Sequence, residues 1–281
     1  MVSVGVHVSI AGSLDQAIDR AKAKGCDVFQ IFSRNPRGWA YKPLSDDECS
    51  VFSGKLQKSE LLPVDHMPYL PNLASPKNDI YEKSIATLTA ELERCGRLGI
   101  RYLVTHLGHH LGYGIAGGRK RVVAAINTSL ATVENNVMLL LENTAGEKNC
   151  VGSSFEHIHS IMDDITEIKR IGVCFDTCHA FAAGYELRTV TGIENTISQF
   201  DELIGLNNIR IIHLNDSKGD LGSGLDRHEH IGMGFIGENG FYNILRRTEI
   251  RALPFVCETP VDKRRDDEGN IRKVRELAGA L

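Results

Sequence analysis

Short runs of β-branched and other apolar residues recur eight times along the chain, and segments with helical spacing lie between them. The runs predict strands over residues 2–8, 28–32, 62–66, 101–106, 137–143, 172–176, 209–214 and 254–258. Between the third and fourth runs, apolar side chains recur at alternating steps of four and three, which predicts one face of a helix. These side chains are Tyr81, Ile85, Leu88, Leu92 and Cys95. The same spacing predicts helices over residues 122–133 and 158–168.

Start signals precede several of the helical segments. Ser13 with Gln16, and Ser45 with Glu48, have the three-residue spacing of a capping box. Ser75 stands directly before a proline, which predicts a capping residue followed by proline at the first helical position. We therefore expect helices to begin at these three places.

Eight alternations of strand and helix predict parallel strands joined by right-handed crossovers. In 281 residues this number of units fits a (β/α)8 TIM barrel better than a doubly wound sheet. The chain contains no internal repeat, low-complexity tract or linker, so we expect one α/β domain over residues 1–281. The charged stretch 262–268 is interpreted as a solvated loop.

Composition and charge narrow the class of protein. The chain is 42% hydrophobic and 24% charged, as in ordinary globular proteins, and no apolar run approaches the roughly 20 residues that span a bilayer. The first residues lack the basic region of a signal peptide, so we expect a cytoplasmic protein without membrane contact. Seven scattered cysteines, an odd number, argue against a disulfide framework, and Cys174 and Cys178 are interpreted as small core residues. A net charge of −4 means that any phosphate-binding site needs a local source of positive potential, which metal ions can supply.

Ionisable side chains stand where the predicted strands end. In a barrel these positions converge on the face that carries active sites. Six of the eight runs have such a group at or next to the last residue, and His7 has the same place in the first run. His179 follows three residues after one of them, and Asp226 with His228 lies in the loop after the seventh run. The six residues are His66, His106, Glu142, Asp176, His213 and Glu258.

Any one of these residues, taken alone, is more often a helix cap or a structural hydrogen-bond partner than a ligand. Together they are costly to bury unless they are paired or bind metal, so the joint pattern favours a metal centre. Imidazole and carboxylate without thiolate suit zinc, manganese, iron or nickel better than calcium. Nine ligands exceed the needs of one four-coordinate ion and imply two or three. Three divalent ions among four carboxylates leave about +2 of net charge, which would attract a phosphodiester. The residues alone therefore indicate a multinuclear metal hydrolase or isomerase on a barrel.

Several long motifs resemble signatures of the endonuclease IV family. One is Leu-Glu-Asn-Thr-Ala-Gly over residues 141–146, and the second spans residues 172–185. The third begins at residues 213–218, continues through residues 222–228 and ends at residues 231–234. The similarity runs without large gaps from residues 5–9 to residues 258–260, almost the whole chain.

The resemblance implies a barrel with three zinc ions, with Mn²⁺ or Fe²⁺ as alternatives at individual sites. It assigns His66, His106 and Glu142 to the first ion. Glu142 would bridge to a second ion, and a metal-bound hydroxide would be the nucleophile. The second ion would be completed by Asp176, His213 and Glu258, and the third would be held by His179, Asp226 and His228.

The activity implied by the resemblance is DNA repair. Such an enzyme hydrolyses the phosphodiester 5′ to an abasic site in double-stranded DNA and leaves 3′-hydroxyl and 5′-deoxyribose phosphate ends. The resemblance also implies removal of 3′ blocking groups, a monomeric state and a cytoplasmic location, associated with the nucleoid during action on DNA.

Further residues are assigned to DNA contact by the same resemblance. Arg37 matches an arginine that inserts into the duplex, and Tyr69 with Leu70 matches the residues that fill the opposite stack. Wedge side chains suit an abasic site because part of its stacking is already lost. Lys218 and Arg227 are candidate phosphate contacts. In the absence of the resemblance, loop packing and surface charge would be the preferred interpretations.

Some positions depart from the family pattern. Pro68 and Pro71 flank the wedge pair and are expected to stiffen that loop, which leaves open whether they alter lesion recognition. His109 and His110 follow the fourth run. With His7, they are candidates to hydrogen-bond to the metal ligands and orient them.

Two rival functions fit part of the pattern. A metal-dependent sugar isomerase or epimerase of the xylose isomerase type shares strand-end Glu, Asp and His ligands but has no need of His179, Asp226 and His228. A non-catalytic lesion-binding protein has no use for nine ligands that are costly to bury.

Overall fold

The computed structural model describes residues 2–279 and confirms the eight strands of the predicted barrel. All of them pair in parallel, in the order β1-β10-β7-β6-β5-β4-β3-β2. His7 bridges to Gln30, and Val8 N donates to the Gln30 carbonyl oxygen at 2.8 Å, so β1 and β2 bring the ring close to closure. The strands are β1 (Val4–Val6), β2 (Val28–Ile31), β3 (Leu62–His66), β4 (Tyr102–Thr105), β5 (Met138–Glu142), β6 (Ile171–Asp176), β7 (Ile209–His213) and β10 (Phe255–Cys257).

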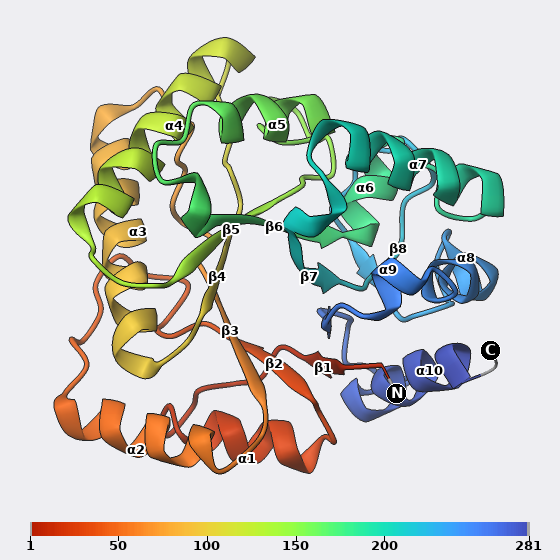
Figure 1. Cartoon of the computed structure of the whole chain (residues 1–281), viewed down its shortest axis with the longest axis horizontal. Coiled ribbons are helices and arrows are strands. Elements are labelled where there is room, and N and C mark those ends of the chain that lie inside the picture. Colours follow the sequence, from red (N-terminus) through yellow and green to blue (C-terminus); the bar gives the residue numbers. More distant parts are fainter. Residues whose placement is uncertain (1, 280–281) are drawn as a thin grey trace.

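Helices surround this ring of strands on the outside (Figure 1). They are α1 (Gln16–Ala23), α2 (Asp46–Gln57), α3 (Asn78–Leu98), α4 (Ile115–Thr132), α5 (Phe155–Asp163), α6 (Thr177–Ala183), α7 (Val190–Leu203), α8 (Gly237–Leu245), α9 (Thr248–Arg251) and α10 (Asp267–Gly279). Two 3-10 turns, η1 (Ile168–Arg170) and η2 (Leu206–Asn208), lead into β6 and β7. A short antiparallel ribbon, β8 (Asp216–Ser217) with β9 (His228–Glu229), lies in the connection between β7 and α8.

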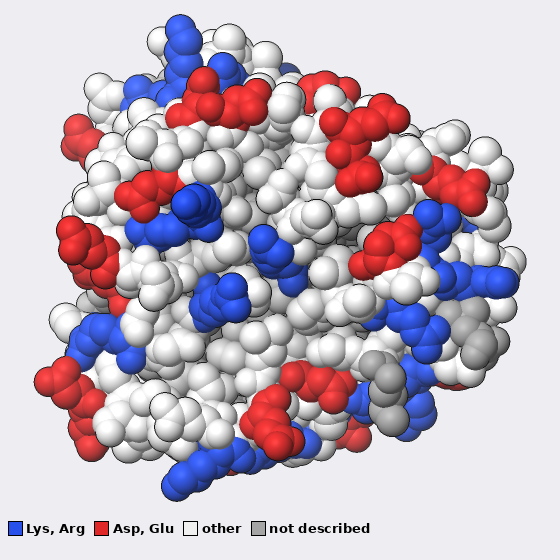
Figure 2. Space-filling view, viewed as in Figure 1, with Lys and Arg blue, Asp and Glu red and all other residues white. Residues whose placement is uncertain are grey.

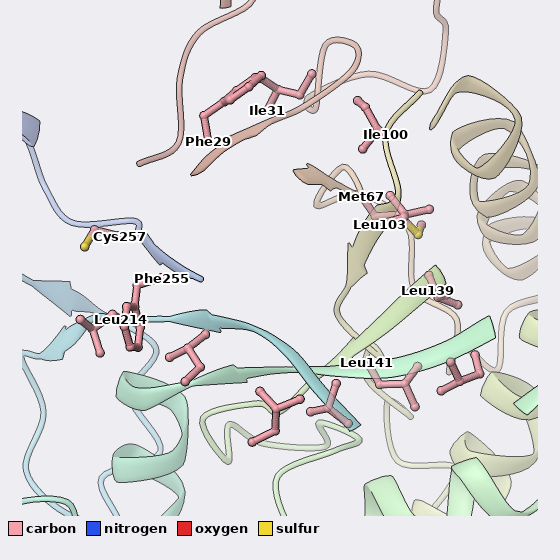
Figure 3. Packing of buried hydrophobic residues seen from close by; sticks show 14 of the residues in the cluster. Phe29, Ile31, Met67, Ile100, Leu103, Leu139, Leu141, Leu214, Phe255 and Cys257 are labelled. Carbon is pink, nitrogen blue, oxygen red and sulfur yellow. The ribbon is translucent and has the colours of Figure 1, made fainter. Parts of the chain in front are cut away.

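Alternation along the strands separates two apolar layers. One set of fully buried residues forms a cluster of its own inside the ring, because alternate side chains of a strand point to the same face. The strand residues between them belong to the larger core that packs against the helices, where Phe29, Leu139 and Phe255 are examples (Figure 3). The inner set is Val28, Val64, Val104, Leu140, Cys174, Ile211 and Val256.

The predicted helix starts have different outcomes. The capping box at Ser45 and Glu48 is confirmed: Ser45 Oγ accepts from Glu48 N at 3.1 Å and Glu48 Oε2 accepts from Ser45 N at 2.8 Å. The box at Ser13 is wrong, because Ser13 Oγ donates to Asp15 Oδ1 at 2.6 Å and α1 begins without a side-chain cap. The cap at Ser75 is also wrong, because this hydroxyl closes a local turn and α3 begins three residues later.

The predicted helix faces are confirmed in α3 and α4, where Leu88, Leu92 and Ile126 are fully buried. The third pattern extends too far, because α5 ends at Asp163 and Ile168 is 44% exposed. The predicted loop 262–268 is right only as far as residue 266, since α10 begins at Asp267. All seven cysteines are buried free thiols. Among residues 2–279, no helix has the length and apolarity to cross a membrane.

Candidate metal centre

The period-two alternation of the strands places the strand-end ionisable groups inside the barrel mouth. Each stands two residues after a member of the inner apolar layer, so it points to the same face one layer higher. Glu142, for example, follows Leu140 and is fully buried. The groups of this upper layer are His66, His106, Glu142, Asp176, His213 and Glu258, with Gln30 completing the series on β2.

Glu142 lies between two groups of imidazoles. Its Oε2 atom is 3.2 Å from His66 Nε2 and 3.1 Å from His106 Nε2. Its Oε1 atom faces the other way and is 3.0 Å from His213 Nδ1. The same carboxylate therefore belongs to two sets of atoms that are close enough to hold a cation, one with His66 and His106 and the other with Asp176, His213 and Glu258.

The second set converges on His213 Nδ1. Glu258 Oε2 is 3.3 Å from this nitrogen and Asp176 Oδ2 is 3.9 Å from it. Asp176 also accepts from His179 N at 2.8 Å and so caps the start of α6, which follows β6 directly. One aspartate thus ends the strand, starts the next helix and faces the mouth.

The third set comes from α6 and the β8–β9 ribbon. His179 Nε2 is 3.1 Å from Asp226 Oδ1, and His228 Nε2 is 3.7 Å from the same oxygen. His228 Nε2 is also 3.7 Å from Asp176 Oδ2, which connects this set to the second. All nine predicted ligands therefore lie in one connected cluster of three sets.

Four of the five imidazoles have one ring nitrogen held by an oxygen and the other facing carboxylates. His66 Nδ1 lies 2.7 Å from the Met67 carbonyl oxygen, and His213 Nε2 lies 2.8 Å from Gln30 Oε1. The Nδ1 atoms of His179 and His228 lie 2.9 and 3.2 Å from the carbonyl oxygens of Asn143 and Glu258, respectively. Donation from the held nitrogen leaves a lone pair on the other, which is the tautomer a metal needs.

Two of the free nitrogens test whether the residues fit a cation. His179 Nε2 and His228 Nε2 are buried and make no well-oriented hydrogen bond within the described part of the chain. Buried polar atoms without partners are costly, and a bound cation would satisfy both. Histidine and carboxylate are also the donors that zinc prefers when thiolates are absent. The donor set therefore fits divalent metal.

The carboxylates and imidazoles of the cluster shift one another's pKa in opposite directions. Burial opposes ionisation of Glu142, but the charges of His106 and His213 outweigh it and hold its pKa well below the ordinary value. Burial is likewise outweighed at Glu258 and Asp226, whose pKa falls to about 2 at each. Conversely, burial opposes a charge on His179, yet Asp176 and its neighbours raise its pKa well above the ordinary value. The carboxylates thus stay ionised and favour positive charge beside them, which imidazole protons supply in the absence of a metal and which a bound cation would supply in their place.

Three polar residues of the site were not predicted. Gln30 Nε2 donates to Glu258 Oε1 at 2.7 Å, and Gln30 occupies the same layer as the ligands. Asn215 Nδ2 donates to Asp176 Oδ2 at 2.7 Å, and Asn143 Oδ1 accepts from Asp176 N at 2.8 Å. The signal for Gln30 was its position two residues after an inner-layer valine.

Cys178, which the sequence favours as a small core residue over a metal ligand, lies beside the candidate ligands. It is fully buried, as a core residue would be, and its Sγ donates to the Arg227 carbonyl oxygen at 3.7 Å. Its sulfur nevertheless lies close enough to Asp176 and His228 to share a cation with them. Burial raises the pKa of this thiol to about 12, so it stays protonated in the absence of a metal.

The candidate supporting histidines have different surroundings. Burial lowers the pKa of His7 to about 4, and its Nδ1 lies 3.3 Å from Gln30 Nε2, next to the upper layer. His110 Nδ1 instead accepts from Gly114 N at 3.1 Å. Within residues 2–279, no hydrogen bond joins the ring of His109 or His110 to the nine residues, because both belong to the loop that leads into α4.

The predicted DNA contacts lie on loops around the same mouth. Tyr69 is 64% exposed, and its ring centroid is 5.9 Å from that of His66, so it stands beside the first set. Leu70 is 40% exposed, and Arg37 is exposed on the loop between β2 and α2. Lys218 and Arg227 are exposed neighbours on the β8–β9 ribbon, where Lys218 N donates to the Arg227 carbonyl oxygen at 2.9 Å.

The loop that carries Tyr69 and Leu70 (residues 68–71) also encloses a small cavity. Pro68 and Pro71, together with His66 and His106, line a cavity of about 70 Å³ under Tyr69. Pro68 is buried and Pro71 is partly exposed, so the loop is held from below while Tyr69 and Leu70 face solvent.

Comparisons with known proteins agree with this geometry. The family model described as xylose isomerase-like TIM barrel matches residues 18–279. The probable endonuclease 4 of Methanoculleus marisnigri is 61% identical over 282 residues and covers all of both chains. Among solved structures, endonuclease IV from Thermus thermophilus is 34% identical with a TM-score of 0.88, covering 99% of this chain and 100% of that one. A D-tagatose 3-epimerase-like protein shares the fold, with a TM-score of 0.72 at 20% identity over 100% of this chain and 99% of its own. The chain therefore belongs to the endonuclease IV family of xylose isomerase-like TIM barrels.

Proposed function

We propose that this protein is a DNA-repair endonuclease that hydrolyses the phosphodiester 5′ to an abasic site in double-stranded DNA with the help of three divalent cations. The observation that carries the proposal is the division of nine buried or half-buried ligands into three connected sets at one barrel mouth. The 61% identity over the full length of a relative named probable endonuclease 4 supports the same activity. The products would be a 3′-hydroxyl and a 5′-deoxyribose phosphate, and 3′ blocking groups would be removed at the same site.

The three sets define which residues would hold the cations. His66, His106 and Glu142 would hold one, and His179, Asp226 and His228 another. The remaining set would share Glu142 and is completed by Asp176, His213 and Glu258. Zinc fits these donors, with manganese or iron as alternatives at individual positions. When bound, such ions supply Lewis acidity, which makes water a nucleophile near neutral pH and stabilises negative charge on a departing oxygen.

The protein's own residues would prepare the site before DNA arrives. Glu142 is held ionised and faces two sets at once, so it fixes their separation. Contacts of His179 and His228 to main-chain oxygens hold their Nε2 atoms toward Asp226. Such preorganisation lowers the cost of reaching the transition state.

The surrounding loops would recognise the lesion. Tyr69 and Leu70 present exposed apolar surface beside the first set, which suits filling of the gap left by a missing base. Arg37 is exposed on the neighbouring loop and would enter the duplex, while Lys218 and Arg227 would contact phosphates. The chain has a net charge of −4, and Figure 2 shows basic and acidic side chains interspersed over one face of the molecule. Binding would depend instead on these local contacts and on the metal charge. We propose that the protein acts as a cytoplasmic monomer, at the nucleoid during repair.

The set formed by His179, Asp226 and His228 distinguishes this proposal from a sugar epimerase. An epimerase on the same barrel needs the strand-end ligands alone, and it gains nothing from an additional set at the ribbon. The wedge pair at Tyr69 likewise has no use with a small sugar.

The test is incision of a duplex that carries one abasic analogue, measured before and after chelation, with metal content determined by mass spectrometry. We expect a single cut 5′ to the analogue, about three metal ions per chain, loss of cutting after chelation and recovery with zinc. An undamaged duplex of the same sequence is the control and should remain intact. Cutting that persists in metal-free protein would contradict the proposal.

A further inference from the structure

A buried ionic network lies beneath the loop between β2 and α2 (residues 32–45), outside the nine ligands. Glu91, in the middle of α3, is fully buried and faces the buried Arg34, with 2.6 Å between Glu91 Oε1 and Arg34 Nε. These two atoms are poorly aligned for a hydrogen bond, so their attraction is electrostatic. The other carboxylate oxygen, Oε2, accepts from Ser33 Oγ at 2.6 Å, and Ser33 Oγ in turn accepts from Arg94 Nε at 2.8 Å.

The same network holds the loop through its main chain. Three guanidinium groups donate to carbonyl oxygens spaced along the loop, and two of them belong to α3. The bonds run from Arg34 Nη1 to Trp39 O at 3.3 Å, from Arg94 Nη1 to Lys42 O at 3.3 Å and from Arg97 Nη1 to Leu44 O at 2.7 Å. The guanidinium carbon of Arg34 also lies 4.3 Å from the centroid of the Tyr41 ring, within the range of a cation–π contact. The loop is therefore fastened to α3 at several points rather than free in solvent.

Asp65 joins this network to the metal centre. Its Oδ1 accepts from Ser33 N at 2.8 Å and from His66 N at 3.1 Å, and its Oδ2 accepts from Cys95 Sγ at 3.2 Å. Ser33 is the second residue of the loop, and His66 is a candidate ligand at the end of β3. One buried carboxylate thus sets the start of the loop relative to the strand that enters the mouth.

From these contacts we propose that Glu91 is a positioning residue for DNA recognition. It fixes Arg34 and Ser33, which hold the loop so that Arg37 is presented at a set place beside the metal centre. This inference rests on the proposed function, because it assigns Arg37 to the DNA. Loss of the charge on Glu91 removes the carboxylate that contacts Arg34, so Arg34 turns toward water and releases the Trp39 carbonyl. The ligands of the three sets do not change.

The kinetic test compares Glu91→Gln with Glu93→Gln, a solvent-facing glutamate on the same helix. In the metal-loaded protein we expect Glu91→Gln to raise KM for abasic DNA by about tenfold or more, because the loop is misplaced. We expect kcat and metal content to stay within about twofold, because the ligands are intact. Glu93→Gln should match the parent protein.

A double-mutant cycle tests whether Glu91 acts through Arg37. When Arg37→Ala is already present, Glu91→Gln should change KM by less than about twofold, because the side chain that the loop presents is gone. Equal effects of Glu91→Gln with and without Arg37 would overturn the positioning role, as would an unchanged KM in the single variant.

Trp39 gives a readout that needs no DNA. It is the one tryptophan of the sequence and lies in this loop, half-buried, with Lys83 Nζ 5.9 Å from its ring centroid. We expect Glu91→Gln to increase quenching of Trp39 by acrylamide and to lower its fluorescence anisotropy. If Glu91→Gln fails to fold, Arg34→Lys keeps the positive charge but has one amino group in place of the fork, and it should loosen Trp39 in the same way. Unchanged Trp39 quenching and anisotropy in the folded variant would refute the proposal. If the Trp39 signals change as expected but the parent protein does not cut abasic DNA, only the proposed function is refuted.

Discussion

Replacement of Glu142 by glutamine tests the shared carboxylate directly. Glutamine has nearly the same shape, so packing at this fully buried position is kept. It retains one oxygen and replaces the other with an amino group, and it removes the negative charge. Oε2 faces His66 and His106 while Oε1 faces His213, so either orientation of the amide points a donor at a nitrogen that should bind metal. One of the two sets loses its carboxylate oxygen completely, and both lose its charge.

The expected loss of incision rate follows from the membership of Glu142 in two sets of candidate ligands. Removal of one preorganised electrostatic group from an active site costs about 10²-fold to 10³-fold in rate. With about 10²-fold for each of the two sets, the incision rate should fall by about 10⁴-fold, or about 5.5 kcal/mol of transition-state stabilisation. Because groups that act as a unit are not additive, a loss of about 10²-fold is the lower bound.

The assay is single-turnover incision of abasic DNA at saturating protein, combined with metal analysis of the same sample. Glu134→Gln, on an exposed glutamate just after α4, is the matched control and should keep full activity. A Glu142→Gln protein with its full metal content and near-normal incision would refute the bridging role, because the two sets would then not depend on one carboxylate.

Two further predictions concern stability. Asp216→Asn should lower the free energy of unfolding by about 3 kcal/mol, because Oδ2 accepts from Gly234 N at 2.9 Å and from Gly237 N at 3.2 Å and about 1.5 kcal/mol is lost with each bond. In urea unfolding, a variant with the same midpoint and the same dependence of the unfolding free energy on urea concentration as the parent would contradict this expectation. Leu140→Ala, in the inner apolar layer, should cost about 2–5 kcal/mol by leaving a cavity, whereas Leu111→Ala at a site 51% exposed should change stability by less than about 0.5 kcal/mol. Equal thermal midpoints for these two variants would show that the inner layer is not close-packed.

The barrel was predictable because its strands are short, buried on both faces and separated by amphipathic helices. The same regularity exposed the site, since an ionisable residue at the end of an apolar strand has few structural reasons to be there. Gln30 was missed because an uncharged polar residue inside the run Val28–Ile31 looks like an ordinary strand residue. Only its parity with the other upper-layer groups distinguishes it, and that parity becomes visible once the strand register is known.

Local signals failed where another partner was closer. The hydroxyls of Ser13 and Ser75 both bind within their own turns, so neither caps the helix that follows. The prediction that the helix continues to residue 168 was wrong for a different reason. Ile165 lies in the segment between α5 and η1 and is buried in the core, while Ile168 turns outward, so the apolar period continues in sequence after the helix has ended. These outcomes depend on tertiary contacts that no window of sequence contains.

The orientation of the imidazoles has a consequence for mutational robustness. His66, His179 and His228 are each aligned by a main-chain oxygen, at 2.7, 2.9 and 3.2 Å. A side-chain substitution cannot remove a main-chain acceptor, so substitutions at the positions that supply these oxygens leave the orientation of the three rings unchanged. His213 differs from these three, because it is aligned by Gln30 Oε1. Gln30 is therefore a place where a single codon change can misdirect a ring of the cluster without altering any of the nine residues.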